Sequence, residues 1–189
     1  MPVEKSRIEG LLVVRWKTFE DVRGFFRQTY ELRELEEALG RAPVLRQGNH
    51  SRSVPGVLRG FHAEPWDKLV YVVRGTAMAA IADIRPESPT FGEVETFQLG
   101  DPPAGERVRL FISEGLANSF CAYGESEVDY LYDVSDYWRA DMDKPALAWD
   151  DPDLAVSWPV DEPKVSDADQ ANPTLRQLFP GHSRFAQGR

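Results

Sequence analysis

Short apolar or alternating segments, separated by turns that contain glycine and proline, make up most of the chain. Many short strands at this spacing are typical of a β-sandwich or barrel and argue against an alternating βα fold. The pattern therefore predicts an all-β fold. The β-branched and aromatic content of the segments predicts strands over residues 11–16, 44–51, 56–63, 68–73, 77–84, 92–99, 107–113, 118–124 and 127–135.

One segment has helical periodicity instead. Within residues 30–42 the apolar side chains recur at helical spacing from Leu32 to Leu39, and Gly40 follows where a C-terminal cap would stand. A turn is predicted just before this segment, at residues 21–24. The sequence thus predicts one short helix near the N-terminus.

The C-terminal part of the chain has a different composition. Residues 145–189 are rich in proline and aspartate, yet they include Trp149 and Trp158. A solvated tail has little use for tryptophan, so we expect this extension to pack on the barrel. The chain has 189 residues and no linker-like stretch, and we expect residues 1–189 to form a single domain.

Composition narrows the class of protein. The contents of 42% hydrophobic and 28% charged residues are those of a soluble globular protein. No apolar run approaches the ~20 residues that span a bilayer. The N-terminal residues MPVEKSRIEG lack the apolar core of a signal peptide. A cytoplasmic protein with no membrane partner is therefore expected.

The charge distribution argues against a nucleic-acid partner. The formal net charge is −9, whereas contacts to phosphates require a basic face. The charge is uneven, because residues 1–60 carry +3 and the remainder carries −12. This asymmetry would allow a local anion pocket formed by Arg23, Arg27, Arg52 and Arg59, although charge alone favours arginines scattered over the surface.

The residues that could bind a metal are few. The three histidines are His50, His62 and His182, and none falls in the later strands over residues 107–135. A metal-dependent cupin needs two or three histidines and a glutamate around one metal. The G-x-S-x-G, P-loop and G-x-G-x-x-G patterns are also missing. We therefore predict no metal and no cofactor, and we interpret the single cysteine, Cys121, as a small buried hydrophobic residue.

The remaining chemistry is acid–base catalysis. A histidine has an ordinary pKa of about 6.5, so His62 could accept a proton near neutral pH if a carboxylate orients it. Taken one at a time, His62, Lys68 and Tyr132 are better explained as packed or surface residues. None of the three is specific by itself.

Taken together, the order of motifs resembles that of the nucleoside-diphosphate-4-keto-6-deoxysugar epimerases, typified by dTDP-4-dehydrorhamnose 3,5-epimerase. The resemblance covers about residues 10–175. The motifs that carry it are FEDVRGFFRQTY, RQGNHSRSVPGVLRGFH, DKLVYVVRG, DIRPESPTFG, FISEGLANSF, YLYDVSDYW, WDDPDLAVSWP and VSDADQANP.

The resemblance implies a jelly-roll (cupin-like) barrel, a homodimer, and a metal-free reaction on a nucleotide-sugar substrate. A proton would be removed from a carbon next to the C4 ketone and returned on the opposite face. His62 matches the general base, Asp169 its paired carboxylate and Tyr132 the opposing acid. Lys68 matches the cation near the developing enolate.

Further positions match substrate contacts. Those that match sugar or phosphate contacts within the barrel are Gln47, Asn49, Arg59, Asn118 and Trp138. Those that match the N-terminal arm, which reaches the neighbouring subunit and holds the nucleotide, are Arg23, Phe26 and Gln28.

The sequence departs from the family pattern at three places. Asn118 replaces a second histidine of the site, and Ala168 replaces the lysine that usually precedes the dyad aspartate. The connection HAEPWDK, from His62 to Lys68, is shorter than usual. These departures leave the nucleotide, the sugar and the choice between C3 and C5 open.

Two structural expectations follow. On a regular strand Arg59 and His62 would face opposite sides, so both reach one cavity only if the strand bulges at Gly60. His62 should also lie within hydrogen-bond reach of Asp169, with Tyr132 across the cavity.

Two other functions remain open. One is a sugar-nucleotide-binding jelly roll without turnover, and the other is a metal-dependent cupin. The epimerase is favoured because binding alone requires neither a base nor an opposed proton donor.

Overall fold

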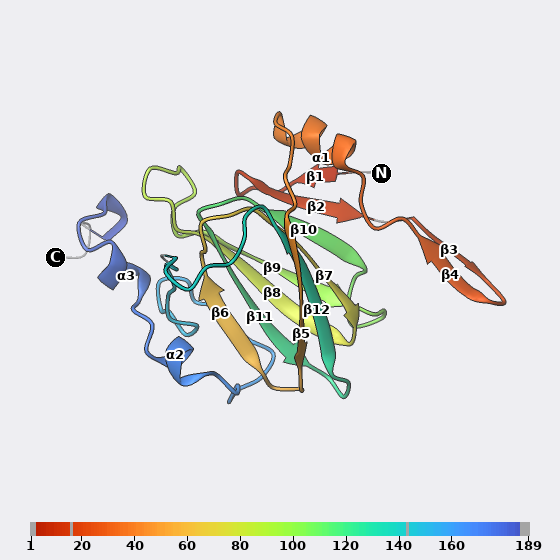
Figure 1. Cartoon of the computed structure of the whole chain (residues 1–189). Coiled ribbons are helices and arrows are strands. Elements are labelled where there is room, and N and C mark those ends of the chain that lie inside the picture. Colours follow the sequence, from red (N-terminus) through yellow and green to blue (C-terminus); the bar gives the residue numbers. More distant parts are fainter. Residues whose placement is uncertain (1–2, 16, 143, 186–189) are drawn as a thin grey trace.

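Two antiparallel sheets face each other in the computed structural model, which describes residues 3–15, 17–142 and 144–185 (Figure 1). The larger sheet has the order β1 (Val3–Lys5), β2 (Leu11–Arg15), β10 (Val108–Ile112), β7 (Lys68–Arg74), β12 (Val128–Val134) and β5 (Gln47–Ser53). The smaller sheet has the order β6 (Leu58–His62), β11 (Leu116–Tyr123), β8 (Thr76–Asp83) and β9 (Val94–Gly100). The predicted all-β fold is confirmed.

The alternation of side chains along the strands creates two apolar layers on the larger sheet. In β7, Val70 and Val72 point into the core between the two sheets, whereas Leu69 points to the outer face. Helix α1 (Leu32–Leu39) covers that outer face and buries Leu35 completely. Between the sheets the core is continuous, so the strands that carry polar groups are held rigidly.

The helices differ in part from the prediction. Helix α1 occupies the segment with helical periodicity and ends at Gly40, whose φ of 72° favours glycine. The prediction of a single helix was wrong, because α2 (Asp167–Gln170), α3 (Leu175–Leu178) and the 3₁₀ turn η1 (Ser183–Phe185) lie near the C-terminus. Four residues form about one helical turn, which is too short for a periodic signal. Among the described residues, no helix has the length and apolar character needed to span a membrane.

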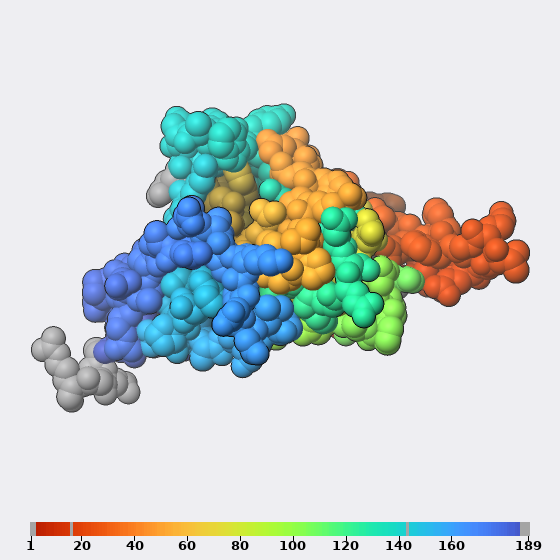
Figure 2. Space-filling model, turned by 90° about the horizontal axis from the view of Figure 1, so that it is seen from below, coloured from red at the N-terminus to blue at the C-terminus, as the bar shows by residue number. Residues whose placement is uncertain are grey.

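A two-stranded hairpin stands away from the rest of the molecule (Figures 1 and 2). It consists of β3 (Thr18–Asp21) and β4 (Gly24–Arg27) and surrounds the predicted turn. Its large apolar side chains are exposed, including Phe26 at 70%. The strand predicted over residues 11–16 is β2 up to Arg15, and Trp16 lies outside the described residues.

The C-terminal extension packs against the outer face of the smaller sheet. Leu147, Leu154 and Leu175 are buried in one apolar cluster with Phe61 of β6. The Trp158 ring lies 6.1 Å from that of Phe61, and its indole N–H donates to the carbonyl oxygen of residue 149 at 2.9 Å. Residues 186–189, predicted as the end of the extension, lie outside the described residues. This packing brings helix α2 next to strand β6.

Candidate active site

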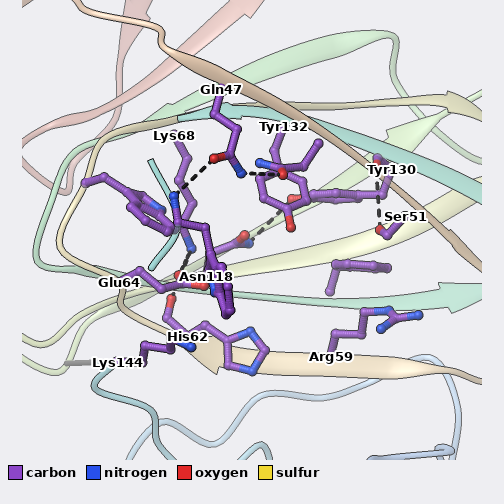
Figure 3. A pocket seen from close by; sticks show the side chains of 14 residues that line it. Gln47, Ser51, Arg59, His62, Glu64, Lys68, Asn118, Tyr130, Tyr132 and Lys144 are labelled. Atoms are coloured by element: carbon purple, nitrogen blue, oxygen red, sulfur yellow. Dashed lines mark hydrogen bonds and ion pairs between the residues drawn. The ribbon is translucent and has the colours of Figure 1, made fainter. Parts of the chain in front are cut away.

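A cavity of about 350 Å³ opens between the two sheets (Figure 3). It collects side chains from strands of both sheets and from the connections that follow β6 and β12. Its lining consists of Gln47, Asn49, Ser51, Arg59, His62, Glu64, Trp66, Lys68, Asn118, Phe120, Tyr130, Tyr132, Trp138 and Lys144. The lining therefore contains eight of the twelve site residues that the sequence singled out.

 A ninth predicted residue, Asp169, lies outside this lining and joins the site through its contact with His62.

Strand β6 is irregular at Gly60, as predicted. The pairing of β6 with β11 shifts between Asn118, which faces His62, and Phe120, which faces Arg59. Gly60 has a φ of +113°, and a Cβ atom there would lie 2.6 Å from the Asn118 carbonyl oxygen. Only glycine fits this position without strain. Because of the bulge, Arg59 and His62 both line the cavity.

The side chains of His62 and Asp169 are in contact. Nε2 of His62 lies 2.7 Å from Oδ1 of Asp169, which is buried on α2. The backbone N–H of Gly60 donates to Oδ2 at 3.4 Å, and Ser166 caps α2 by accepting from the Asp169 N–H at 3.1 Å. An ionised carboxylate only accepts hydrogen bonds, so Nε2 carries the hydrogen and Nδ1 keeps the lone pair that a base needs.

Tyr132 belongs to β12 of the opposite sheet and lies across the cavity from His62 (Figure 3). Burial and the nearby charge of Glu64 raise the pKa of the Tyr132 phenol, and Arg59 offsets part of this effect. The phenol therefore keeps its proton at neutral pH and can donate it. The predicted contact between His62 and Asp169 and the predicted position of Tyr132 across the cavity are both present.

Lys68 forms the first residue of β7 and is buried. Its ammonium group forms an ion pair with Glu64, and it donates to the carbonyl oxygen of His62 at 3.4 Å. Burial opposes the ionisation of Glu64, but the charge and hydrogen bond of Lys68 outweigh it and lower the pKa of the carboxyl group. The cavity thus holds a cation and an anion side by side.

Amide groups and an indole form another part of the wall. The Gln47 side chain donates to Oδ1 of Asn49 at 2.8 Å and accepts from the backbone N–H of Trp138 at 3.0 Å. The buried Asn118 amide donates to the hydroxyl oxygen of Tyr130 at 3.5 Å. These groups offer donors and acceptors of the kind that bind sugar hydroxyls.

The three residues predicted on the arm do not reach the cavity of the same chain. Arg23 pairs with Asp21 of the hairpin at 2.5 Å, and Phe26 is exposed. The amide of Gln28 donates to Glu31 at 3.3 Å. The structure therefore separates these residues from the eight that line the cavity.

The four arginines considered as an anion pocket are also dispersed. Arg23 and Arg27 lie on the hairpin, Arg52 pairs with Asp129 at 2.8 Å, and Arg59 lines the cavity. Among the described residues, no group of three or more His, Cys, Asp or Glu side chains is placed to hold a metal ion. Cys121 is buried, and this burial raises the pKa of its thiol to about 11.

Sequence reasoning missed several lining residues. Three of them had a detectable signal. Ser51 continues the alternation of Gln47 and Asn49 along β5, Phe120 follows Asn118 by two positions on β11, and Tyr130 precedes Tyr132 by two positions on β12. The others, which lie in connections without a periodic signal, are Glu64, Trp66 and Lys144.

Known proteins resemble this chain over most of its length. The family model for dTDP-4-dehydrorhamnose 3,5-epimerase matches residues 5–177. A dTDP-4-dehydrorhamnose 3,5-epimerase of Shigella flexneri is 37% identical over 173 residues, which cover 89% of this chain and 93% of the relative.

Two solved structures share the fold. NovW, a 4-keto-6-deoxy sugar epimerase of Streptomyces spheroides, has a TM-score of 0.88 and 32% identity, with 95% of this chain and 90% of NovW covered. ChmJ, a 3'-monoepimerase of Streptomyces bikiniensis solved in complex with dTDP-quinovose, has a TM-score of 0.83 and 27% identity, with 93% and 89% covered. The chain belongs to the dTDP-4-dehydrorhamnose 3,5-epimerase family.

Proposed function

We propose that this chain is an isomerase that epimerises a nucleoside-diphosphate-4-keto-6-deoxyhexose, most simply a dTDP-linked one, at C3, C5 or both. The observation that carries the proposal is the contact of 2.7 Å between His62 and Asp169, opposite the Tyr132 phenol in one cavity. The names of the relatives support the same class of reaction and substrate.

The reaction begins at a carbon next to the C4 ketone. His62 takes the proton, the C–H electron pair forms a carbon–carbon double bond, and the carbonyl π pair moves onto O4 to give an enolate. Asp169 accepts from the imidazole and stabilises its charged form. The enolate then collapses, and its carbon takes the Tyr132 proton on the opposite face. Exchange with water returns a proton to Tyr132 and removes one from His62.

The charge on O4 requires stabilisation during the reaction. A positioned cation or donor next to such an oxygen contributes about 10²–10³-fold to the rate. Lys68, whose ammonium group lies in the cavity lining, supplies this charge. The sugar or the phosphates are contacted by Gln47, Asn49, Arg59, Asn118 and Trp138.

The strand order supports a jelly roll. Strands β10, β7, β12 and β5 are neighbours in the larger, six-stranded sheet, and β6, β11, β8 and β9 form the smaller one, so consecutive strands alternate between the sheets in part of the chain. The cytoplasmic location stays a prediction.

The hairpin supports a homodimer. Arg23 and Phe26 are exposed on a segment that projects from the molecule (Figure 2), and they have no place in the cavity of their own chain. We propose that the hairpin, with Gln28 at its base, reaches the cavity of a second copy and contacts the nucleotide there.

Incubation with dTDP-4-keto-6-deoxyglucose in D₂O tests the proposal, because each inverted carbon acquires a deuterium from the solvent. Mass spectrometry counts the incorporated deuterium against a control without enzyme. Two deuteriums indicate inversion at both C3 and C5, and one indicates a single centre. A sugar that is bound but acquires no deuterium would contradict the proposed reaction and favour a binding protein.

A further inference from the structure

The connection between β6 and β7 places a carboxylate against the buried lysine. Glu64 lies in this connection, residues 63–67, and pairs with Lys68 at the cavity wall (Figure 3). The exposed fraction is 6% for the Lys68 side chain and 20% for that of Glu64. The other hydrogen bond of the ammonium group, to the His62 carbonyl oxygen, is longer at 3.4 Å. Glu64 is thus the main partner of Lys68.

The same connection is anchored at its far end. Asp67 accepts from Arg41 at 2.7 Å and from the backbone N–H of Glu114 at 3.1 Å, and its own N–H donates to Ser135 at 2.9 Å. These contacts tie the end of the connection to three separate segments of the chain. The path that carries Glu64 to Lys68 is therefore fixed at both ends, by β6 and by Asp67.

A lysine needs such support to act as an electrostatic catalyst. Its charge sits on a flexible four-carbon stem, whereas stabilisation of an oxyanion requires a donor already in place. A buried ammonium group without a counter-ion is also costly to desolvate. A carboxylate nevertheless has an opposite effect, because its negative charge repels the developing enolate. The two effects of Glu64 predict opposite results for its removal.

We propose that Glu64 is a positioning residue that holds the Lys68 ammonium group against the cavity wall, where the enolate charge develops, and that it acts through Lys68 rather than on the substrate. This inference rests on the proposed epimerase function and deepens it. Two observations favour positioning over simple repulsion of the enolate. Lys68 is buried, and besides Glu64 its ammonium group contacts the His62 carbonyl oxygen.

A double-mutant cycle tests the inference. Glu64→Gln, Lys68→Met and the double variant are compared by their rates of deuterium incorporation at saturating and limiting substrate. We expect Glu64→Gln to lower kcat by about 10–100-fold and to change KM by less than about threefold. In the Lys68→Met background, the same Glu64→Gln change should alter kcat by less than about twofold.

The other outcomes overturn the inference. An unchanged or raised kcat in Glu64→Gln would mean that repulsion dominates, and an equal loss in both backgrounds would mean that Glu64 contacts the substrate directly. If Glu64→Gln unfolds more easily than wild type, Glu64→Asp serves instead and should retain more activity than Glu64→Gln. Glu125→Gln, exposed and outside the cavity lining, is the matched control and should behave as wild type. A wild-type protein that incorporates no deuterium would overturn the proposed function itself.

Discussion

The cavity and the hairpin present their predicted site residues in opposite ways. In the cavity, His62 is held by Asp169 at 2.7 Å and Lys68 is paired with Glu64. On the hairpin, the side chains of Arg23 and Phe26 are 85% and 70% exposed. The cavity side chains are held by partners within the same chain, whereas the hairpin side chains are exposed. Changes in the cavity should therefore affect kcat, and changes on the hairpin should affect KM.

The largest effect is expected for His62→Asn. The amide keeps a polar group near Asp169 but cannot take the proton, so we expect kcat to fall by about 10³-fold with KM within about threefold. Rates of deuterium incorporation measure the loss. A variant that keeps a tenth of the wild-type rate would show that another group is the base.

The next effect concerns stability and compares two glycines with positive φ. Gly60→Ala would place a Cβ 2.6 Å from a backbone oxygen of residue 118, whereas the Cβ in Gly24→Ala on the hairpin meets nothing within 4 Å. We expect the free energy of unfolding to fall by about 3 kcal/mol for Gly60→Ala and by about 1 kcal/mol for Gly24→Ala. Urea unfolding measures both, and equal losses would contradict the rigid packing assigned to β6.

Most of the framework was predictable, because it follows from local patterns. Alternation and turn residues predicted the strands of both sheets except β1, and helical spacing predicted α1. The bulge at Gly60 was also predictable, because alternation alone would have sent Arg59 and His62 to opposite faces. Strand β1 and the one-turn helices are too short to produce such a pattern.

The site was predictable only in part. The approach of Asp169 to His62 spans 107 positions in the sequence, and the resemblance to a family, rather than any spacing, predicted it. Glu64 lies in an irregular connection, where no periodicity indicates which way a side chain points. Its pairing with Lys68 depends on how Asp67 is anchored, which involves segments distant in the sequence.

A smaller effect is expected on the pH dependence of kcat. Burial and the charge of Glu64 raise the pKa of Tyr132, so the donor stays protonated to higher pH and the alkaline fall in kcat should begin above about pH 10. Glu64→Gln removes one of the charges that raise this pKa, and the fall should then begin at lower pH. The charged and titratable groups that face Tyr132 are Glu64, Arg59 and Tyr130. A shift to higher pH in Glu64→Gln would contradict this assignment.

The smallest effect is expected for Arg23→Ala on the hairpin. Under the proposed nucleotide contact, loss of this exposed cation should raise KM by about tenfold and leave kcat within about twofold. The free energy of unfolding should stay unchanged, because the side chain is exposed. Steady-state kinetics measures the split, and a fall in kcat alone would place Arg23 in the chemical step.

Mixing two variants tests whether the hairpin serves a second copy. A dimer of one His62→Asn chain and one Arg23→Ala chain has one cavity in which base and arginine are both intact, provided that the hairpins are exchanged. We expect the mixture to recover part of the wild-type activity at low substrate concentration, which neither variant has alone. No recovery would mean that each hairpin serves its own cavity.

In the proposed reaction, His62 abstracts a proton next to the C4 ketone. Proton NMR of dTDP-4-keto-6-deoxyglucose in D₂O tests it most directly, because it locates the exchanged positions. With wild-type protein we predict loss of the C3 signal, the C5 signal or both, and no loss elsewhere on the sugar. With His62→Asn, we predict exchange slower by about 10³-fold. Exchange at the wild-type rate in His62→Asn, or at a carbon not adjacent to the ketone, would contradict the account.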